Sequence, residues 1–86
     1  MNNKIMIKLI VPELETEYDV YIPITKRIGN IIKLLIKAIT DMGYEYDNDS
    51  KIALYNRITG EKYKSNELII DTSIRNGTEL ILLKAD

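Results

Sequence analysis

Residues 25–43, TKRIGNIIKLLIKAITDMG, are the only long stretch of the chain with the periodicity of an amphipathic helix. At about 100° per residue, the large apolar side chains fall on one face of this predicted helix. These side chains are Ile28, Ile31, Ile32, Leu35, Ile39 and Met42. Thr25 is the expected N-cap, and Gly43 is the expected residue that closes the helix in the left-handed conformation. Such a stripe needs an apolar partner surface, which the β-branched runs on either side of it can supply.

Short runs with the alternation of β-strands lie on both sides of the predicted helix. Residues 4–11, KIMIKLIV, and residues 17–22, EYDVYI, should pair as an antiparallel hairpin, because only a short turn separates them. Residues 51–55 form the third predicted strand, Tyr63 begins a very short fourth one, and residues 78–83 form the last. This order predicts an α+β fold of the β-grasp type, a mixed four- or five-stranded sheet with one helix packed on one face. The first and last strands should lie parallel in its middle.

The segment between the last two predicted strands contributes to the core in an irregular conformation. Leu68, Ile70 and Ile74 are its expected core anchors. Leu34 falls beyond the edge of the helical stripe, so it is either covered by residues 64–72 or exposed.

The composition describes a small globular protein and disfavours several function classes. With 86 residues, 45% of them hydrophobic, the chain suits a single domain, residues 1–86. A formal net charge of −1 argues against a nucleic-acid partner, because such binders are normally strongly basic. No apolar run approaches the roughly 20 residues of a membrane span, so no direct membrane insertion is expected. Cysteine is absent, which fits a cytoplasmic protein, and histidine, the usual general base and metal ligand, is absent too.

No arrangement of polar residues predicts a catalytic or metal site. Asp47, Asn48 and Asp49 look like the start of a calcium loop, but the glycine of its sharp turn and its distal glutamate are missing. The glycines are too scattered to cradle a phosphate, and no candidate nucleophile has a histidine partner. We therefore expect a protein that is not an enzyme and that carries no cofactor and no metal.

Apolar residues on the sheet face turned away from the predicted helix are the candidates for protein binding. The outward apolar set is Leu14, Ala53, Tyr55, Ile81 and Leu83, of which Leu14, Tyr55, Ile81 and Leu83 are the candidate partner-binding residues. Tyr55 and Leu83 should meet, because the strands that carry them are neighbours in a β-grasp sheet. A contiguous exposed patch of this kind usually marks a protein contact, and Lys8 and Lys51 would form its polar rim. The alternative interpretation is that this face merely tolerates scattered apolar residues.

The outer side of the predicted helix is basic. It carries Lys26, Arg27, Lys33 and Lys37. A helix of this kind in isolation would suit a membrane surface or a nucleic acid. Because the apolar side of the predicted helix is needed for the core, we interpret the lysines as its solvent-exposed side.

Two passages, VYIPITKRIGNIIKLLIKAI at residues 20–39 and SIRNGTELILL at residues 73–83, resemble ubiquitin-like β-grasp domains. Within that superfamily, the chain is similar to the YukD/EsaB-type proteins of the type VII secretion systems of Gram-positive bacteria. The residues that carry the resemblance are Pro23, Ile24, Ile28, Ile31, Ile32, Leu35, Ile74, Gly77 and Leu80.

The resemblance implies a non-catalytic protein-binding module in the cytoplasm. It would be an accessory or regulatory component that docks on cytoplasmic domains of a membrane secretion apparatus, and a homodimer is a further option. The chain ends in Leu83-Lys84-Ala85-Asp86 rather than the Gly-Gly of ubiquitin, so conjugation is not expected and residues 84–86 should be dispensable for folding. The alternatives are an orphan β-grasp adaptor unrelated to secretion and, with less support, a sulfur-carrier-like protein.

Overall fold

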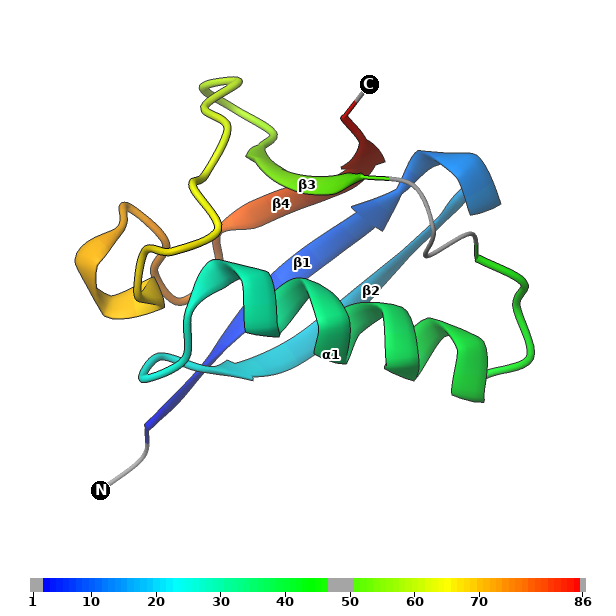
Figure 1. The fold of residues 1–86 in the computed structure, drawn as a ribbon, viewed down its shortest axis with the longest axis horizontal. Coiled ribbons are helices and arrows are strands. Elements are labelled where there is room, and N and C mark those ends of the chain that lie inside the picture. The colour runs from blue at the N-terminus through cyan, green and yellow to red at the C-terminus, as the bar shows by residue number, and fades with distance from the viewer. Residues whose placement is uncertain (1–2, 47–50, 86) are drawn as a thin grey trace.

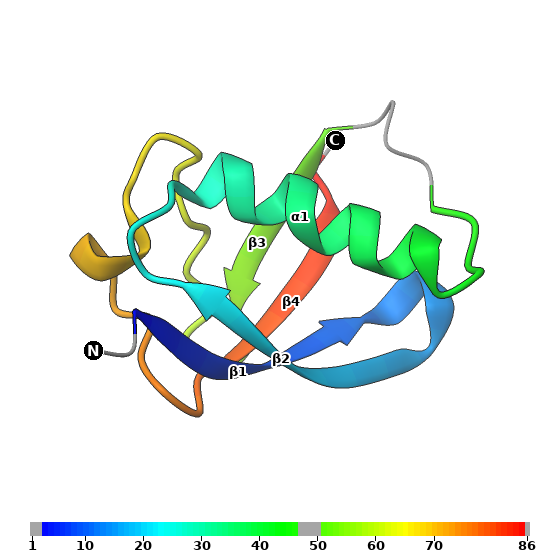
Figure 2. The same ribbon diagram turned by 90° about the horizontal axis from the view of Figure 1, so that it is seen from below.

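Four strands form one mixed sheet in the computed structural model, which describes residues 3–46 and 51–85. The elements are β1 (Lys4–Val11), η1 (Pro12–Leu14), β2 (Thr16–Pro23), α1 (Ile28–Asp41), β3 (Ile52–Asn56), η2 (Ile69–Asp71) and β4 (Glu79–Lys84). The order across the sheet is β2-β1-β4-β3, with β1 and β4 parallel and the other neighbours antiparallel. The helix α1 crosses one face of the sheet and leaves the other face open (Figures 1 and 2). The predicted α+β arrangement with a central parallel pair is confirmed.

The core forms between α1 and the inward side of the strands. The buried aliphatic residues of α1 are Ile28, Ile31, Ile32, Leu35, Ile36 and Ile39. Those of the strands include Ile7, Leu9, Val11, Ile22, Leu54, Leu80 and Leu82. The predicted stripe is wrong at its last member, because Met42 is the C-cap residue beyond the helix and is 51% exposed. Leu34 is 49% exposed, so residues 64–72 do not cover it.

A distant segment caps the N-terminus of α1. The predicted N-cap, Thr25, is wrong: Arg27 holds this position, and its side chain makes no capping hydrogen bond. Instead, the N–H of Ile28 donates to the carbonyl of Glu67 at 2.8 Å, and the N–H of Gly29 donates to that of Ser65 at 2.9 Å. These bonds satisfy N–H groups that a helix start leaves free. At the other end, Gly43 has a φ of 97° and closes the helix as predicted.

The segment between β3 and β4 differs from the prediction at two points. Tyr63 begins no strand, since the segment contacts β3 through a single bridge between Tyr55 and Lys62. The 3-10 turn η2 places Ile69 in the core and leaves Ile70 53% exposed, so the expected anchor at Ile70 is wrong. Thr72 stabilises this turn, because its buried hydroxyl donates to the carbonyl of Ile69 at 2.6 Å. Ile74 is buried as predicted, and Leu68 is half-buried.

The C-terminal residues take part in the sheet. Lys84 is the last residue of β4 and lies opposite Ile52 of β3. The N–H of Ala85 donates to the carbonyl of Lys51 at 2.8 Å. The expectation that residues 84–86 are dispensable for folding considers their side chains alone, whereas residues 84 and 85 make these backbone contacts.

Candidate functional site

A row of apolar side chains crosses three strands on the face of the sheet opposite α1. Tyr55 of β3 lies opposite Ile81 of β4, and Ile81 lies opposite Ile10 of β1. The core residues beside them in sequence are Leu9 and Val11 in β1, Leu54 in β3, and Leu80 and Leu82 in β4. Because side chains alternate along a strand, the side chains of Tyr55, Ile81 and Ile10 point away from the core. In the next row, Leu83 of β4 lies opposite Ala53 of β3. We call these five residues the open-face patch.

The open-face patch is contiguous and partly accessible. Ile10, Tyr55, Ile81 and Leu83 are half-buried, while Ala53 is only 5% exposed. Side chains directly opposite each other across a sheet lie about 4.5–5.5 Å apart at Cβ, so they form one surface. Tyr55 and Leu83, which the sequence predicted to meet, are diagonal neighbours, and Ile81 and Ala53 are their direct partners.

Charged side chains border the open-face patch along one side. Lys8 of β1 lies opposite Glu79 of β4. This border contains two ion pairs, Lys8 with Glu17 at 3.9 Å and Arg57 with Glu79 at 3.5 Å. These groups are substantially exposed, and such pairs contribute only about 0–1 kcal/mol each to stability. They give the patch a charged rim at Lys8, as the sequence predicted.

Leu14 and Lys51, which the sequence predicted at this surface, do not belong to the open-face patch. Leu14 belongs to η1, packs against the core and lines a separate hollow with Glu13 and Tyr46. Lys51 precedes β3 and lines a groove along the outer edge of that strand. Of the predicted binding residues, Tyr55, Ile81 and Leu83 are brought together.

Ile10 is the member of the patch that the sequence prediction left out. It occupies the centre of the sheet between Ile81 and Glu17. The signal was present in KIMIKLIV, where an isoleucine stands at an outward position of the first strand. Only the register between β1 and β4 shows that this residue continues the row of Tyr55 and Ile81.

The described part of the chain shows neither a metal-binding cluster nor a membrane-spanning helix. Residues 3–46 and 51–85 contain no group of acidic, cysteine or histidine side chains placed to hold a metal ion. The calcium-loop candidates Asp47, Asn48 and Asp49 lie outside these residues. Among the helices described, none has the length and apolar character needed to cross a membrane.

Comparison with known proteins identifies the fold. No protein-family model matches the sequence, and no curated protein matches it. A chain of a toluene 4-monooxygenase HD complex with 4-bromobenzoate superposes with a TM-score of 0.80 at 4% identity, covering 95% of this chain and 99% of that one. The ubiquitin-like domain of Plasmodium falciparum Dsk2 gives a TM-score of 0.73 at 13% identity, covering 95% and 99%.

A third similar structure is part of a larger assembly. A chain of the MycP5-free ESX-5 inner membrane complex gives a TM-score of 0.71 at 11% identity. The match covers 98% of this chain and 21% of that chain. At these identities the comparisons establish the fold alone: the protein has the ubiquitin-like β-grasp fold, with one helix on a mixed four-stranded sheet.

Proposed function

We propose that this protein is a non-catalytic, ubiquitin-like binding module that docks on a protein partner through the open-face patch. The observation that carries the proposal is the row of Ile10, Ile81 and Tyr55 across three strands, extended by Leu83. Such a row offers a continuous apolar surface with a charged rim, which is the usual composition of a protein contact. Tyrosine is also enriched among the residues that dominate binding energy.

We further propose that the partner belongs to a type VII secretion machine and that the protein acts on its cytoplasmic side as an accessory or regulatory component. Two observations support this assignment: the YukD/EsaB-type resemblance of the sequence, and the structural similarity to part of a chain of the ESX-5 inner membrane complex. An orphan β-grasp adaptor is the alternative. The genes beside the coding sequence distinguish the two, because the secretion role requires components of the secretion machine among them.

The test measures binding to purified cytoplasmic domains of the membrane proteins encoded beside this chain. Tyr55→Ala combined with Leu83→Ala should weaken binding at least about tenfold, which corresponds to about 1.4 kcal/mol. Leu34→Ala combined with Tyr44→Ala is the matched control, because it removes the same residue types from exposed positions outside the patch.

The two variants have distinct expected outcomes. The control pair should bind like the unmodified protein. If the patch pair binds normally while Lys33→Glu with Lys37→Glu abolishes binding, the site lies on the helix side and the proposal is wrong.

A further inference from the structure

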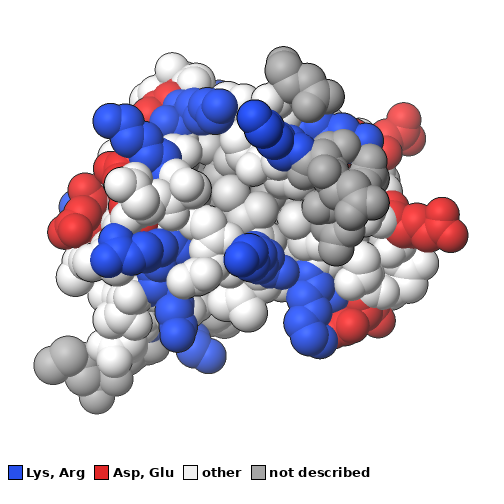
Figure 3. Space-filling view, in the orientation of Figure 1, with Lys and Arg blue, Asp and Glu red and all other residues white. Residues whose placement is uncertain are grey.

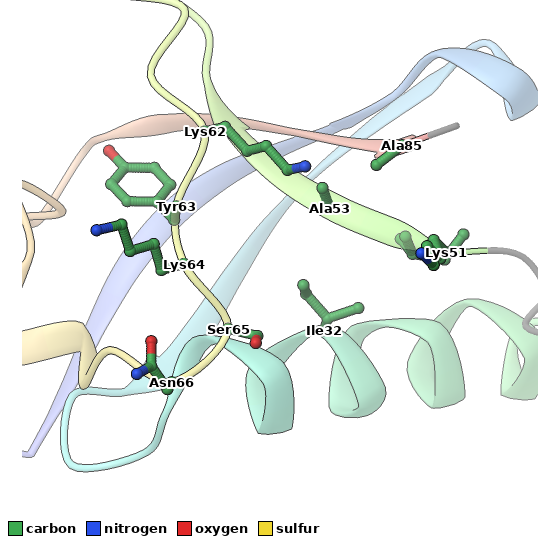
Figure 4. A pocket seen from close by; sticks show the side chains of 10 residues that line it. Ile32, Lys51, Ala53, Lys62, Tyr63, Lys64, Ser65, Asn66 and Ala85 are labelled. Atoms are coloured by element: carbon green, nitrogen blue, oxygen red, sulfur yellow. The ribbon is translucent and has the colours of Figure 1, made fainter.

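A groove lies along the outer edge of β3, between this strand, α1 and residues 62–66 (Figure 4). Its volume is about 700 Å³. Ile32 points from α1 toward β3, and Ala53 lies on the strand itself. Ile32 and Ile52 give the groove an apolar floor on the side of α1, whereas the side chain of Ala53 points away from α1 (Figure 4). The groove is separate from the proposed binding face, with Ala53 as a shared residue.

The backbone of β3 is open at the end that lines this groove. The carbonyl of Lys51 accepts from Ala85, and the N–H of Arg57 donates to Glu79, so the odd-numbered residues of β3 bond toward β4. The backbone N–H and C=O groups of the even-numbered residues therefore point toward the outer edge of the sheet. The carbonyl of Leu54 is taken by the N–H of Tyr63 at 3.0 Å. Within residues 3–46 and 51–85, no backbone group bonds the outward side of Ile52.

The groove is also positively charged. Three of its ten lining residues are lysines, Lys51, Lys62 and Lys64, and none is acidic. None of these three lysines takes part in an ion pair with any described residue. The side chain of Lys62 runs beside β3 above Ala53, whereas that of Lys64 leaves in the opposite direction (Figure 4).

This charge is local rather than a property of the whole protein. The chain has a net charge of −1, yet Lys and Arg gather on the face that carries α1 and the groove, with Asp and Glu at its margins (Figure 3). A long polyanion lying across the molecule would meet those acidic margins. Among the described residues that line the groove, the only charged side chains that a short acidic segment would meet are lysines.

We propose that the groove binds an extended acidic peptide segment of a partner protein. An aliphatic side chain of this segment packs on Ile32 and Ile52, and the carboxylates on either side of it lie near Lys62 and Lys51. The open outward side of Ile52 offers the backbone of the segment a place to pair, as happens when a peptide adds to the edge of a sheet. This site does not depend on the proposed secretion role.

The experiment uses the full chain, labelled with nitrogen-15, and a synthetic peptide with a central leucine flanked on each side by aspartate and glutamate. Two control peptides replace the acidic residues by their amides, or the leucine by glycine. Saturable chemical-shift changes are expected at the amides of residues 32, 52–53 and 62–66, with weaker binding of both control peptides. Raising the salt concentration from about 50 to about 300 mM should weaken binding, because screening shortens the range of the lysine charges.

Charge-reversal variants separate the groove from general attraction. Lys51→Glu with Lys62→Glu should reduce the affinity for the peptide at least about tenfold. Lys33→Glu with Lys37→Glu changes the net charge equally on α1 outside the groove and should have less than about a twofold effect. Lys51→Gln with Lys62→Gln provides a milder pair if charge reversal disturbs folding.

Four outcomes would overturn the proposal: no saturable binding, equal losses in the two charge-reversal pairs, equal affinity for the amide peptide, or tighter binding of a single-stranded oligonucleotide to the same lysines. Tyr55→Ala with Leu83→Ala should leave peptide binding intact. The proposal for the groove and the proposal for the open-face patch can therefore be refuted independently of each other.

Discussion

Gly29 of α1 lies against the backbone of Ser65, with its N–H donating to the Ser65 carbonyl at 2.9 Å. A Cβ at position 29 would lie 3.3 Å from that carbonyl oxygen and 3.4 Å from the Ser65 Cβ. This close approach explains a glycine in the first turn of the helix, where alanine would normally be favoured by about 1 kcal/mol.

The first prediction follows from this contact. Gly29→Val should lower the free energy of unfolding by roughly 1–3 kcal/mol, because a branched side chain must displace the capping segment. Gly29→Ala should show none of the usual gain of alanine over glycine. Urea unfolding measures both, with Asn30→Ala at the adjacent exposed position as the control. A stabilisation by Gly29→Val would show that the segment at Ser65 yields easily.

A second prediction compares two adjacent leucines of α1. Leu35 is 5% exposed and Leu34 is 49% exposed. Leu35→Ala should cost roughly 2–5 kcal/mol through lost burial and the cavity left behind. Leu34→Ala should change stability by less than about 0.5 kcal/mol, as surface substitutions usually do. Urea unfolding of the two variants checks this, and similar costs would contradict the assigned helix face.

The third prediction concerns Ile10. Ile10→Asp should weaken binding to the partner of the open-face patch at least about tenfold, because it places a charge at the centre of the apolar row. Met6→Asp is the matched control, since Met6 lies on the same face of β1 but beyond Lys8. Binding is measured by titration calorimetry. Equal losses in the two variants would point to damage to β1 rather than to a contact.

A fourth prediction concerns the C-terminus. Deleting residues 84–86 should lower the free energy of unfolding by about 1–2 kcal/mol, because the pairing at Lys84 and the bond from Ala85 to Lys51 are lost. Lys84→Ala keeps the backbone and should cost less. Thermal unfolding of the two variants compares them, and an unchanged transition after the deletion would show that this end of β4 contributes little.

The fifth prediction concerns alkaline pH. Burial, and then the neighbouring Glu13 carboxylate, raise the pKa of Tyr46 above its ordinary value. The folded state therefore holds this proton more tightly than the unfolded chain. This contribution to stability is fully present below about pH 10 and is lost as the pH rises further.

Tyr46→Phe tests this assignment. Its hydroxyl is buried and has no hydrogen-bond partner within residues 3–46 and 51–85, so its removal should not reduce stability near neutral pH. The variant should also lose less stability than the unmodified protein above about pH 10. A similar alkaline loss in both proteins would assign the effect to other tyrosines.

Much of the fold follows from local sequence patterns. KIMIKLIV predicts β1 with the residue bounds that the structure shows, and the periodicity of the helical stretch identifies every buried position of α1 except the flanking Ile36. Gly43 marks the end of the helix because its backbone conformation is a local requirement. Side-chain periodicity and turn preferences act over a few residues, so a single sequence displays them.

The capping of α1 and the composition of the open-face patch were decided by the tertiary structure. Arg27 is the N-cap instead of Thr25, and the carbonyls of Glu67 and Ser65, far along the chain, accept the first N–H groups of the helix. Ile10 joins Ile81 and Tyr55 because of the register between strands that are separated by most of the sequence. Alternation tells which face of a strand a residue occupies. Which residues become neighbours on that face depends on long-range pairing, which local periodicity does not encode.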